Sequence, residues 1–331
     1  MSLTKLTTGT IRWGIIGCGN VTELKSGPAY QLTKGFELNA VMRRDAAKAE
    51  DYAKRHHVPK FYSNADELIN DTEVDAIYIA TPPDSHKYYA LKVAEAGKPC
   101  CIEKPMASNY EDCLVIYTAF ERKKLALFVA YYRRTLPRFT KIKTWLDDGA
   151  IGEVRTVQWT LHKPPSKIDL SQEFNWRTDA QVAPGGYFDD LASHGLDLFN
   201  YLLGDIEEAR GFSSNQQKLY SAIDCVAAVW QHKTGITGSG NWNFGTCHRQ
   251  DKVIITGSKG AIQFSIFDNS PLILKNEEGE IKLEIEHPKH IQLHHVEAMR
   301  DHLFYEDSDH PSTGISALHT SWVMDKILGK I

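Results

Sequence analysis

The sequence predicts an α/β protein in which a doubly wound parallel sheet is followed by an α+β domain with a broad, mostly antiparallel open sheet. The first 130 residues alternate short, nearly continuous apolar runs with amphipathic stretches, which is the pattern of parallel strands covered by helices on both faces. After about residue 135, strand-length runs follow one another across short turns, which is typical of antiparallel pairing. The length of 331 residues supports two domains, because it exceeds what one hydrophobic core usually stabilises.

The N-terminal pattern assigns residues 1–130 to a first domain of alternating strands and helices. Predicted strands are 11–16, 37–42, 75–80, 100–103 and 126–131. Predicted helices are 45–56, 64–70, 85–96 and 108–123. Gly27 and Pro28 interrupt the helical stretch after the first strand, so we expect that helix to be kinked or broken there.

Residues 131–331 form the predicted α+β domain for substrate binding and oligomerisation. A helix at 137–148 and a strand at 153–161 lead through a proline-bearing loop to a long apolar helix at 185–204. The later predicted strands are 206–213, 222–231, 236–244, 252–257, 261–266, 272–275 and 281–286, and two helices follow at 292–305 and 315–328. A broad sheet with one face not obviously covered by helices needs a partner surface.

Composition excludes several classes of protein. The chain is 42% apolar and 24% charged, as ordinary globular proteins are. Its formal net charge of -4 and pI near 6.4 give no basic footprint for nucleic acid, and no apolar run is long enough to span a membrane. The first residues lack the basic and apolar regions of a secretory signal, and the cysteines form no C-x-x-C pair. We therefore expect a cytoplasmic protein with reduced, structural cysteines.

The stretch GCGNVT, residues 17–22, follows the first predicted strand, where a dinucleotide fingerprint G-x-G-x-x-G would lie. The first glycine permits a tight turn, and the second permits close approach of a pyrophosphate to the N–H groups of the next helix. Thr22 replaces the third glycine, and a plain glycine turn is the alternative. The position after the first strand of a βαβ pattern favours a Rossmann dinucleotide site, with cofactor contacts from Gly17, Gly19, Asn20 and Val21.

Two arginines end the second predicted strand, where an acidic residue would bind the ribose 2′-hydroxyl of NAD. The guanidinium groups of Arg43 and Arg44 suit bidentate recognition of a phosphate instead. The expected cofactor is therefore NADP, with NAD less favoured. The alternative is that both arginines are solvated loop charges, while Asp45 caps the helix at 46–56.

The loop TPPDSH, residues 81–86, follows the next predicted strand. Its prolines stiffen the loop, which is expected to form a rigid wall against the cofactor through Thr81, Pro82 and His86. Capping of the following helix by the polar residues of the loop is the more ordinary role, and both roles are compatible.

Glu103, Lys104 and Pro105 end the fifth predicted strand. A residue before proline favours extended geometry, so Lys104 is held out at the carboxyl edge of the sheet, where open α/β sheets bind ligands. We expect Glu103 and Lys104 to contact the cofactor. An ordinary surface lysine is the alternative.

The predicted helix at 185–204 carries Asp190, His194 and Asp197 at spacings i, i+4 and i+7, on one face. If Asp190 accepts a hydrogen bond from one imidazole nitrogen of His194, it fixes the tautomer and leaves the other nitrogen for the substrate. The competing explanation is structural, with three polar side chains satisfied inside a domain interface. Burial of an unpaired charge is costly, so this helix is a candidate site.

Several motifs in this order resemble the glucose-fructose oxidoreductase, inositol dehydrogenase and MocA-type (Gfo/Idh/MocA) family over nearly the whole chain. They are GCGN, TPPDSH, EKP, YRR of 132–134, WR of 176–177 and the GG-x3-D-x3-H-x2-D pattern of 185–197. The resemblance implies that Lys104, Asp190 and His194 are the catalytic set. Trp176 and Arg177 are expected to contact the cofactor, and Tyr132, Arg134 and Asp197 the substrate. The family's usual acidic residue after the second strand is not matched, because Arg43 stands there.

The expected function is an NAD(P)-dependent oxidoreductase, NADP-preferring, that transfers hydride between nicotinamide and a hydroxyl or carbonyl of a sugar, polyol, cyclitol or diol. In the cleft expected between the domains, Lys104 and the Asp190–His194 pair would act on one substrate oxygen. Two alternatives remain: a nicotinamide-dependent glycoside hydrolase of the same fold, and a non-catalytic NADP-binding protein.

No metal site is expected. The histidines at 290, 294, 295 and 302 lack the two-histidine spacing of helical zinc proteases, and a solvated helix surface explains them better.

Overall fold

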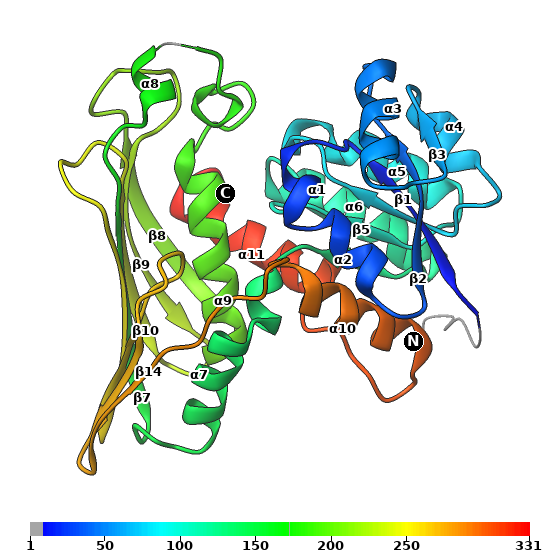
Figure 1. Ribbon diagram of the computed structural model, residues 1–331. Helices are drawn as coiled ribbons and strands as arrows, with labels where there is room; N and C mark the ends of the chain where they lie inside the picture. Colours follow the sequence, from blue (N-terminus) through cyan, green and yellow to red (C-terminus); the bar gives the residue numbers. More distant parts are fainter. Residues whose placement is uncertain (1–8, 172) are drawn as a thin grey trace. The chain divides into compact units, whose positions relative to one another are not determined.

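The computed structural model describes residues 9–171 and 173–331, and the chain divides into two compact units (Figure 1). The first unit comprises Met1–Leu136 and Pro288–Leu318, and the second comprises Pro137–His287 and His319–Ile331. The first boundary lies near the expected position at residue 130. The segment Pro288–Leu318 differs, because it belongs to the first unit and not to the second.

The first unit contains a six-stranded sheet whose neighbouring strands are all parallel, in the order β3-β2-β1-β4-β5-β6. Its strands are β1 (Ile11–Ile16), β2 (Phe36–Met42), β3 (Lys60–Tyr62), β4 (Ala76–Ile79), β5 (Cys100–Ile102) and β6 (Leu127–Val129). The order reverses at β1, which pairs with both β2 and β4. The predicted doubly wound parallel sheet is confirmed, and only β3 was not predicted.

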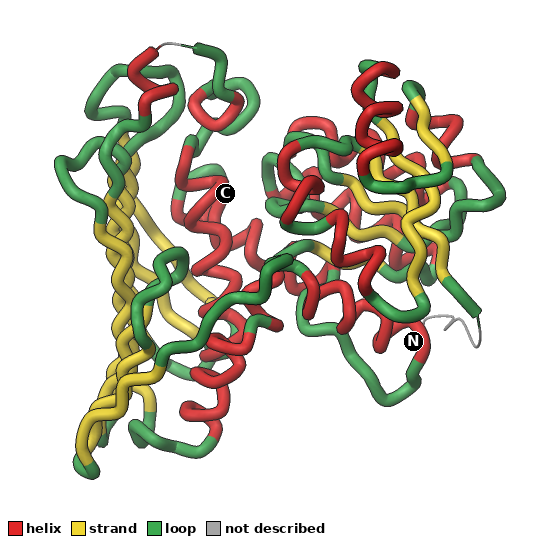
Figure 2. The backbone as a smooth tube through the Cα atoms, in the orientation of Figure 1, coloured by secondary structure: helices red, strands yellow, loops and turns green. Residues whose placement is uncertain are grey.

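Helices cover both faces of this sheet (Figure 2). They are α1 (Asn20–Leu24), α2 (Gly27–Leu32), α3 (Ala46–Arg55), α4 (Ala65–Asn70), α5 (His86–Glu95), α6 (Tyr110–Lys123), α10 (Leu293–Phe304) and the start of α11 (Gly314–Ile327). Strand β4 is buried at every residue, which explains its continuous apolar sequence. One core cluster packs α4, α5 and α6 on the sheet, and a second packs α2, α3 and α10 on it.

The return of α10 to the first unit has a clear physical cause. Val296, Met299 and Leu303 of α10 are buried in the same cluster as Trp13 and Tyr30. Apolar burial of this kind outweighs sequence proximity in deciding which unit a helix joins. The expected solvated surface is therefore wrong for two of the histidines in this region, because His295 is fully buried and His302 is 7% exposed.

The helix after β1 is broken, as predicted from Gly27 and Pro28. Helix α1 ends at Leu24 and α2 begins at Gly27, with proline in its first turn. The break leaves the Thr22 carbonyl to accept a hydrogen bond from the Tyr52 hydroxyl at 2.9 Å. A Cβ at Gly27 would lie 2.3 Å from that carbonyl oxygen, so the close approach requires glycine.

The second unit contains an eight-stranded sheet in the order β14-β13-β12-β11-β7-β10-β9-β8. Its strands are β7 (Val154–His162), β8 (Ile206–Ser214), β9 (Cys225–His232), β10 (Thr237–Asn243), β11 (Gln250–Gly257), β12 (Gly260–Phe264), β13 (Leu272–Asn276) and β14 (Gly279–Leu283). Only β7 and β10 pair in parallel, and the other neighbours are antiparallel. The predicted broad, mostly antiparallel sheet is confirmed.

Helices α7 (Pro137–Asp147) and α9 (Ser193–Leu203) lie along one face of this sheet in Figure 1, and α8 (Lys167–Ser171) is a single short turn. Trp159 of β7 packs edge-on against Phe199 of α9, with ring centroids 5.8 Å apart. A Cβ at Gly195 would lie 2.3 Å from the Trp159 ring, so glycine lets α9 sit directly on β7. This contact fixes the depth at which the neighbouring His194 is buried.

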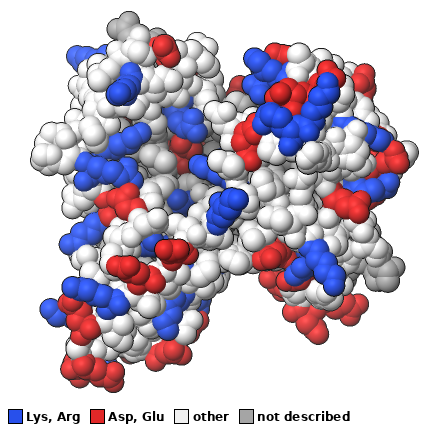
Figure 3. Space-filling view, viewed as in Figure 1, with Lys and Arg blue, Asp and Glu red and all other residues white. Residues whose placement is uncertain are grey.

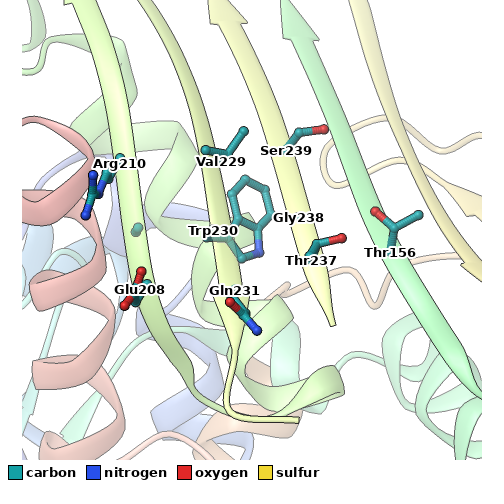
Figure 4. Close-up of a pocket in the computed structure, with 10 residues that line it drawn as sticks. Thr156, Glu208, Arg210, Val229, Trp230, Gln231, Thr237, Gly238 and Ser239 are labelled. Carbon is teal, nitrogen blue, oxygen red and sulfur yellow. The ribbon is translucent and has the colours of Figure 1, made fainter. Parts of the chain in front are cut away.

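Among the residues that the structure describes, no helix of the second unit covers the opposite face of the sheet. Phe212 is 88% exposed and Val229 is 61% exposed on this face, whereas the alternate residue Trp230 is buried. A shallow pocket on it is lined by side chains of β7, β8, β9 and β10 (Figure 4). We call this surface the open sheet face.

The surface is mixed in charge, and on the side drawn in Figure 3 Lys and Arg are interspersed with Asp and Glu. Within the described part of the chain, no helix combines the length and apolar character needed to cross a membrane.

Candidate active site

The turn at the end of β1 contains two glycines, and each position suits glycine for a different structural reason. Gly17 has φ +93°, and a Cβ there would lie 2.7 Å from Cγ2 of Thr81, so both backbone and packing require glycine. Gly19 has φ -129°, and a Cβ added there would lie 3.8 Å from the Gly17 carbonyl oxygen. Because the Gly17 carbonyl oxygen is the only atom of the described residues, apart from Gly19 and its two chain neighbours, that comes within 4 Å of that position, the turn leaves room for a group to approach the backbone, which fits a cofactor pyrophosphate.

The first turn of α1 completes this loop. Asn20 is exposed and Val21 half-buried, while Thr22, which replaces the third glycine, is fully buried. Its hydroxyl donates to the Gly19 carbonyl at 2.8 Å. Threonine therefore closes the turn by a hydrogen bond to its own loop.

Arginine 43 extends from the end of β2 toward the same turn. Its Nη1 donates to the Cys18 carbonyl at 3.4 Å, and both Arg43 and Arg44 are exposed. Asp45 caps α3 by accepting from the Lys48 backbone N–H at 3.2 Å, so the expected capping role is confirmed. The guanidinium of Arg43 thus lies beside the glycine turn.

His86 joins the loops after β4 and β5. Its ring is fully buried, with Nδ1 3.0 Å from the Pro105 carbonyl and Nε2 2.7 Å from the Thr81 carbonyl. Burial lowers the pKa of His86. Since both nitrogens face backbone carbonyls of the unit itself, the imidazole links the two loops, which differs from the cofactor contact expected of it.

The EKP stretch lies at the carboxyl end of β5. Glu103 is 8% exposed; its Oε1 accepts hydrogen bonds from the Tyr78 hydroxyl at 2.7 Å and from Gln292 Nε2 at 2.6 Å. Its Oε2 accepts from the Lys104 backbone N–H at 3.1 Å. Lys104 itself is half-buried. The carboxylate is thus bound inside its own unit, while the lysine follows it at the edge.

In the second unit, the predicted helix at 185–204 consists of two kinds of helix. Phe188–Ala192 is π-helical, and α9 continues from Ser193. The continuous α-helix assumed from the i, i+4 spacing is therefore wrong across Asp190. A π-helical turn widens the backbone hydrogen-bonded ring, and such turns are frequent at functional sites.

Asp190 is 7% exposed and accepts a hydrogen bond from Arg177 Nε at 2.6 Å. The guanidinium of Arg177 also lies over the Trp176 ring, 4.3 Å from its centroid. The WR motif and Asp190 are therefore neighbours in this unit. His194, 4% exposed, packs edge-on against Phe267 with centroids 5.8 Å apart.

The three residues expected at the substrate are buried to different degrees. Asp197 is fully buried and accepts from the Thr320 hydroxyl at 3.0 Å, so it anchors α9 to α11. Arg134, in the 3-10 turn Tyr132–Thr135 of the first unit, is 6% exposed and donates to the Pro311 carbonyl at 2.8 Å. Tyr132 is half-buried beneath the Arg133 guanidinium, 5.1 Å from its ring centroid.

Sequence reasoning missed a polar cluster in the second unit. Asp169 is 6% exposed and accepts from the Tyr187 hydroxyl and the Ser166 backbone N–H, both at 2.7 Å. Lys163 Nζ lies 4.5 Å from the Tyr187 ring centroid, and burial lowers the pKa of this lysine, which also feels the charge of Asp190. Tyr187 stands beside the D-x3-H motif, which is the only local signal that could have indicated the cluster.

Asp189, another residue not singled out, is buried next to Asp190. Its Oδ2 accepts from the Gly185 backbone N–H at 2.8 Å. Burial raises the pKa of Asp189 to about 6. Among the described residues, no group of three or more His, Cys, Asp or Glu side chains could hold a metal ion.

The predicted residues therefore gather in two sets, one in each unit. The first set lies at the carboxyl ends of the adjacent strands β2, β1, β4 and β5 and comprises Gly17, Gly19, Arg43, Thr81, Pro82, Glu103 and Lys104. The second set comprises Trp176, Arg177, Asp190 and, one helical turn on, His194.

Comparison with known proteins agrees with this architecture. Residues 11–131 match an oxidoreductase family with an NAD-binding Rossmann fold, and residues 139–263 match the GFO/IDH/MocA C-terminal domain. Oxidoreductase P35 of Formosa agariphila is 36% identical over 96% of this chain and 98% of its own length. Trans-1,2-dihydrobenzene-1,2-diol dehydrogenase of Bos taurus is 25% identical over 82% of this chain and 80% of its own.

A solved structure of levoglucosan dehydrogenase in complex with NADH and levoglucosan has the same fold. It superimposes with a TM-score of 0.82 at 21% identity, covering 97% of this chain and 96% of that one.

Proposed function

Because the chain belongs to the Gfo/Idh/MocA oxidoreductase family, we propose that it transfers hydride between NADP and a hydroxyl or carbonyl group of a sugar, polyol, cyclitol or diol. The names of two relatives, a diol dehydrogenase and a levoglucosan dehydrogenase, support this substrate class. The proposal rests on two groups of candidate catalytic side chains. Lys104 lies at the carboxyl edge of the Rossmann sheet, and the buried Asp190 and His194 lie on the helix of the second unit.

The residues have distinct roles in this proposal. The bound nicotinamide accepts or delivers the hydride. Lys104 donates a hydrogen bond to the reacting substrate oxygen, and its charge stabilises alkoxide character there. His194 exchanges a proton with the same oxygen, a role worth roughly 10²- to 10⁴-fold in rate. Asp190 holds the imidazole tautomer, and Arg177 in turn holds Asp190 through the 2.6 Å hydrogen bond.

The preference for NADP is assigned to Arg43. Arg43 follows the end of β2, and its guanidinium lies beside the glycine turn that follows β1, where a dinucleotide fold binds the adenosine ribose. A planar cation at this place suits a 2′-phosphate, whereas an acidic residue suits the free 2′-hydroxyl of NAD. The NADH-bound relative therefore need not share the cofactor of this chain.

The cofactor assignment is tested by Arg43→Asp, with Arg44→Asp as the matched control. We expect Arg43→Asp to lower kcat/KM for NADPH at least tenfold and to leave or raise that for NADH. The control, whose parent side chain is exposed and makes no hydrogen bond or ion pair among the described residues, should change either value less. Equal NADPH affinity before and after Arg43→Asp would refute the phosphate assignment.

The catalytic assignment is tested by Lys104→Ala and a substrate panel of aldoses, keto-sugars, polyols and diols, followed by NADPH absorbance in both directions. Turnover should collapse in Lys104→Ala while NADPH still binds. Consumption of glycosides without net change of NADPH would favour the hydrolase alternative instead. NADPH binding with no turnover on any compound would favour a binding protein.

We also propose that the chain acts as a homodimer or homotetramer that pairs through the open sheet face. The exposed Phe212 and Val229 support this, since a soluble monomer gains nothing from leaving them in water.

A further inference from the structure

A buried hydrogen-bonded group lies directly beneath Lys104. The Glu103 carboxylate is the centre of this group, and its two oxygens have different partners. Oε1 accepts from the Tyr78 hydroxyl at 2.7 Å and from Gln292 Nε2 at 2.6 Å, whereas Oε2 accepts from the Lys104 backbone N–H at 3.1 Å. Tyr78 is fully buried and Gln292 is 1% exposed. Water therefore has little access to replace either donor.

The two donors come from separate parts of the first unit. Tyr78 lies on β4, the neighbour of β5, and its backbone is in register with Cys101. Gln292 lies 189 positions from Glu103 in the sequence, at the N-terminal cap of α10. The Gln292 backbone is fixed as well, because its N–H donates to the Lys25 carbonyl at 3.2 Å and its carbonyl accepts from the Val296 N–H at 3.0 Å.

These contacts define the orientation of the carboxylate. Two neutral donors on Oε1 prevent rotation of the Glu103 carboxylate, so Oε2 stays at the Lys104 N–H. A hydrogen bond to an ionised acceptor is stronger than one between neutral groups, so the set is a rigid one. The backbone of Lys104 is thus restrained from the interior of the unit.

We propose that Tyr78 and Gln292 are positioning residues for Lys104. They act through Glu103: they hold its carboxylate, the carboxylate holds the Lys104 peptide, and the peptide sets the direction in which the ammonium extends. The inference rests on the proposed catalytic role of Lys104. It also gives the returning segment Pro288–Leu318 a part in the reaction, because Gln292 belongs to that segment.

The inference predicts a loss of rate without a loss of cofactor binding. A small displacement of a catalytic group can cost up to about 100-fold in rate. We expect Tyr78→Phe and Gln292→Met each to lower kcat roughly ten- to 100-fold, because each removes one donor and keeps the bulk of the side chain. The NADPH Kd should stay within about twofold, and the KM for the sugar-type substrate should change less than kcat.

Tyr30→Phe is the matched control. Tyr30 is also fully buried and stacks on Tyr78 with ring centroids 5.1 Å apart, but it makes no hydrogen bond to Glu103 in the described chain. Its replacement removes a buried tyrosine hydroxyl from the same aromatic cluster, so it reports any general effect on packing. We expect its kcat to equal that of the parent protein.

A double-mutant cycle separates positioning from general structure. If Tyr78 acts through Lys104, adding Tyr78→Phe to Lys104→Ala should lower the residual kcat less than twofold. A second readout needs no substrate: reductive methylation with ¹³C-formaldehyde gives a resonance for Lys104, assigned by its absence in Lys104→Ala. Its chemical shift should change in Tyr78→Phe and Gln292→Met, and not in Tyr30→Phe.

The outcomes are distinct. Parental kcat and an unshifted Lys104 resonance in folded Tyr78→Phe would overturn the inference, as would an equal loss of rate with and without Lys104. Should Gln292→Met fail to fold, Tyr78→Phe still decides, because it retains the buried ring. Full turnover in Lys104→Ala would instead refute the catalytic role of Lys104, and the inference with it. If Lys104→Ala does lose turnover but Tyr78→Phe keeps the parental kcat and Lys104 resonance, only the inference is refuted.

Discussion

Replacement of Asp189 by asparagine should stabilise the protein at alkaline pH. Asp189 is buried, and its pKa is raised to about 6 from the ordinary 3.8, chiefly by loss of hydration, with Asp325 and Asp190 also raising it and Lys330 opposing them. The folded state therefore binds more protons than the unfolded state between pH 3.8 and 6. It follows that this carboxyl reduces stability as pH rises through that window, and most fully above pH 6.

The magnitude follows from the pKa difference. At 1.36 kcal/mol per pH unit, a change from 3.8 to about 6 corresponds to roughly 3 kcal/mol at pH 8. At pH 4.5 the same relation gives only about 1 kcal/mol. The asparagine side chain keeps an oxygen that accepts from the Gly185 N–H, but its NH2 group is a new buried donor. If that donor finds no acceptor, the variant loses about 1–3 kcal/mol of stability. The stability gain at pH 8 exceeds the gain at pH 4.5 by about 2 kcal/mol, and the cost of the amide does not affect this difference because it is the same at both pH values.

Urea unfolding followed by circular dichroism at pH 8 and pH 4.5 measures this difference. Relative to the parent protein, Asp189→Asn should gain about 2 kcal/mol more at pH 8 than at pH 4.5. Asp148→Asn, which replaces an exposed aspartate in the same unit, is the control and should show no such pH dependence. An equal effect of Asp189→Asn at both pH values would refute the reasoning.

Three further predictions concern the site and the assembly. Gly19→Ala adds a Cβ to open space and should weaken NADPH binding at least tenfold, measured by fluorescence titration, with an unchanged melting temperature. Gly17→Ala, at φ +93°, should lower the melting temperature measured by calorimetry. Arg177→Met removes the cation paired with Asp190 and should lower kcat about tenfold in steady-state assays, so an unaltered kcat would contradict the proposed role. The proposed pairing through the open sheet face predicts that Phe212→Asp gives smaller species than the parent protein in size-exclusion chromatography with light scattering, while Phe174→Asp, which replaces another exposed phenylalanine, does not.

Much of the fold follows from local sequence patterns. Strands such as β1 and β4 are fully or almost fully buried, so continuous apolar runs reveal them. In β9 alternate residues are buried, so an alternation of buried and more exposed positions marks the strand. Strand β3 escaped because it has only three residues, Lys60–Tyr62, none of them buried. Its place at the sheet edge results from pairing with β2 and not from its own sequence.

The candidate site was predictable where topology alone brings residues together. Parallel strands end at one edge, so Gly17, Arg43 and Lys104 were expected to gather there, and each lies at the end of its strand. The Arg177–Asp190 pair and the π-helical turn were not predictable, because tertiary packing and a changed hydrogen-bond register decide them. Gln292 carried no signal at all, since nothing in its surroundings in the sequence indicates Glu103.

The way the chain leaves the first unit after Leu136 and comes back at Pro288 limits how this protein can be divided. A fragment that stops at residue 136 would retain all six parallel strands yet uncover the aromatic surface of Trp13 and Tyr30 that α10 shields. Such a fragment should aggregate, whereas a gene in which a linker replaces residues 137–287 and which ends at Leu318 should yield a soluble nucleotide-binding domain. Because the chain passes into the second unit again after Leu318, within α11, the second unit is more than an insertion, and any replacement of it has to respect three crossing points.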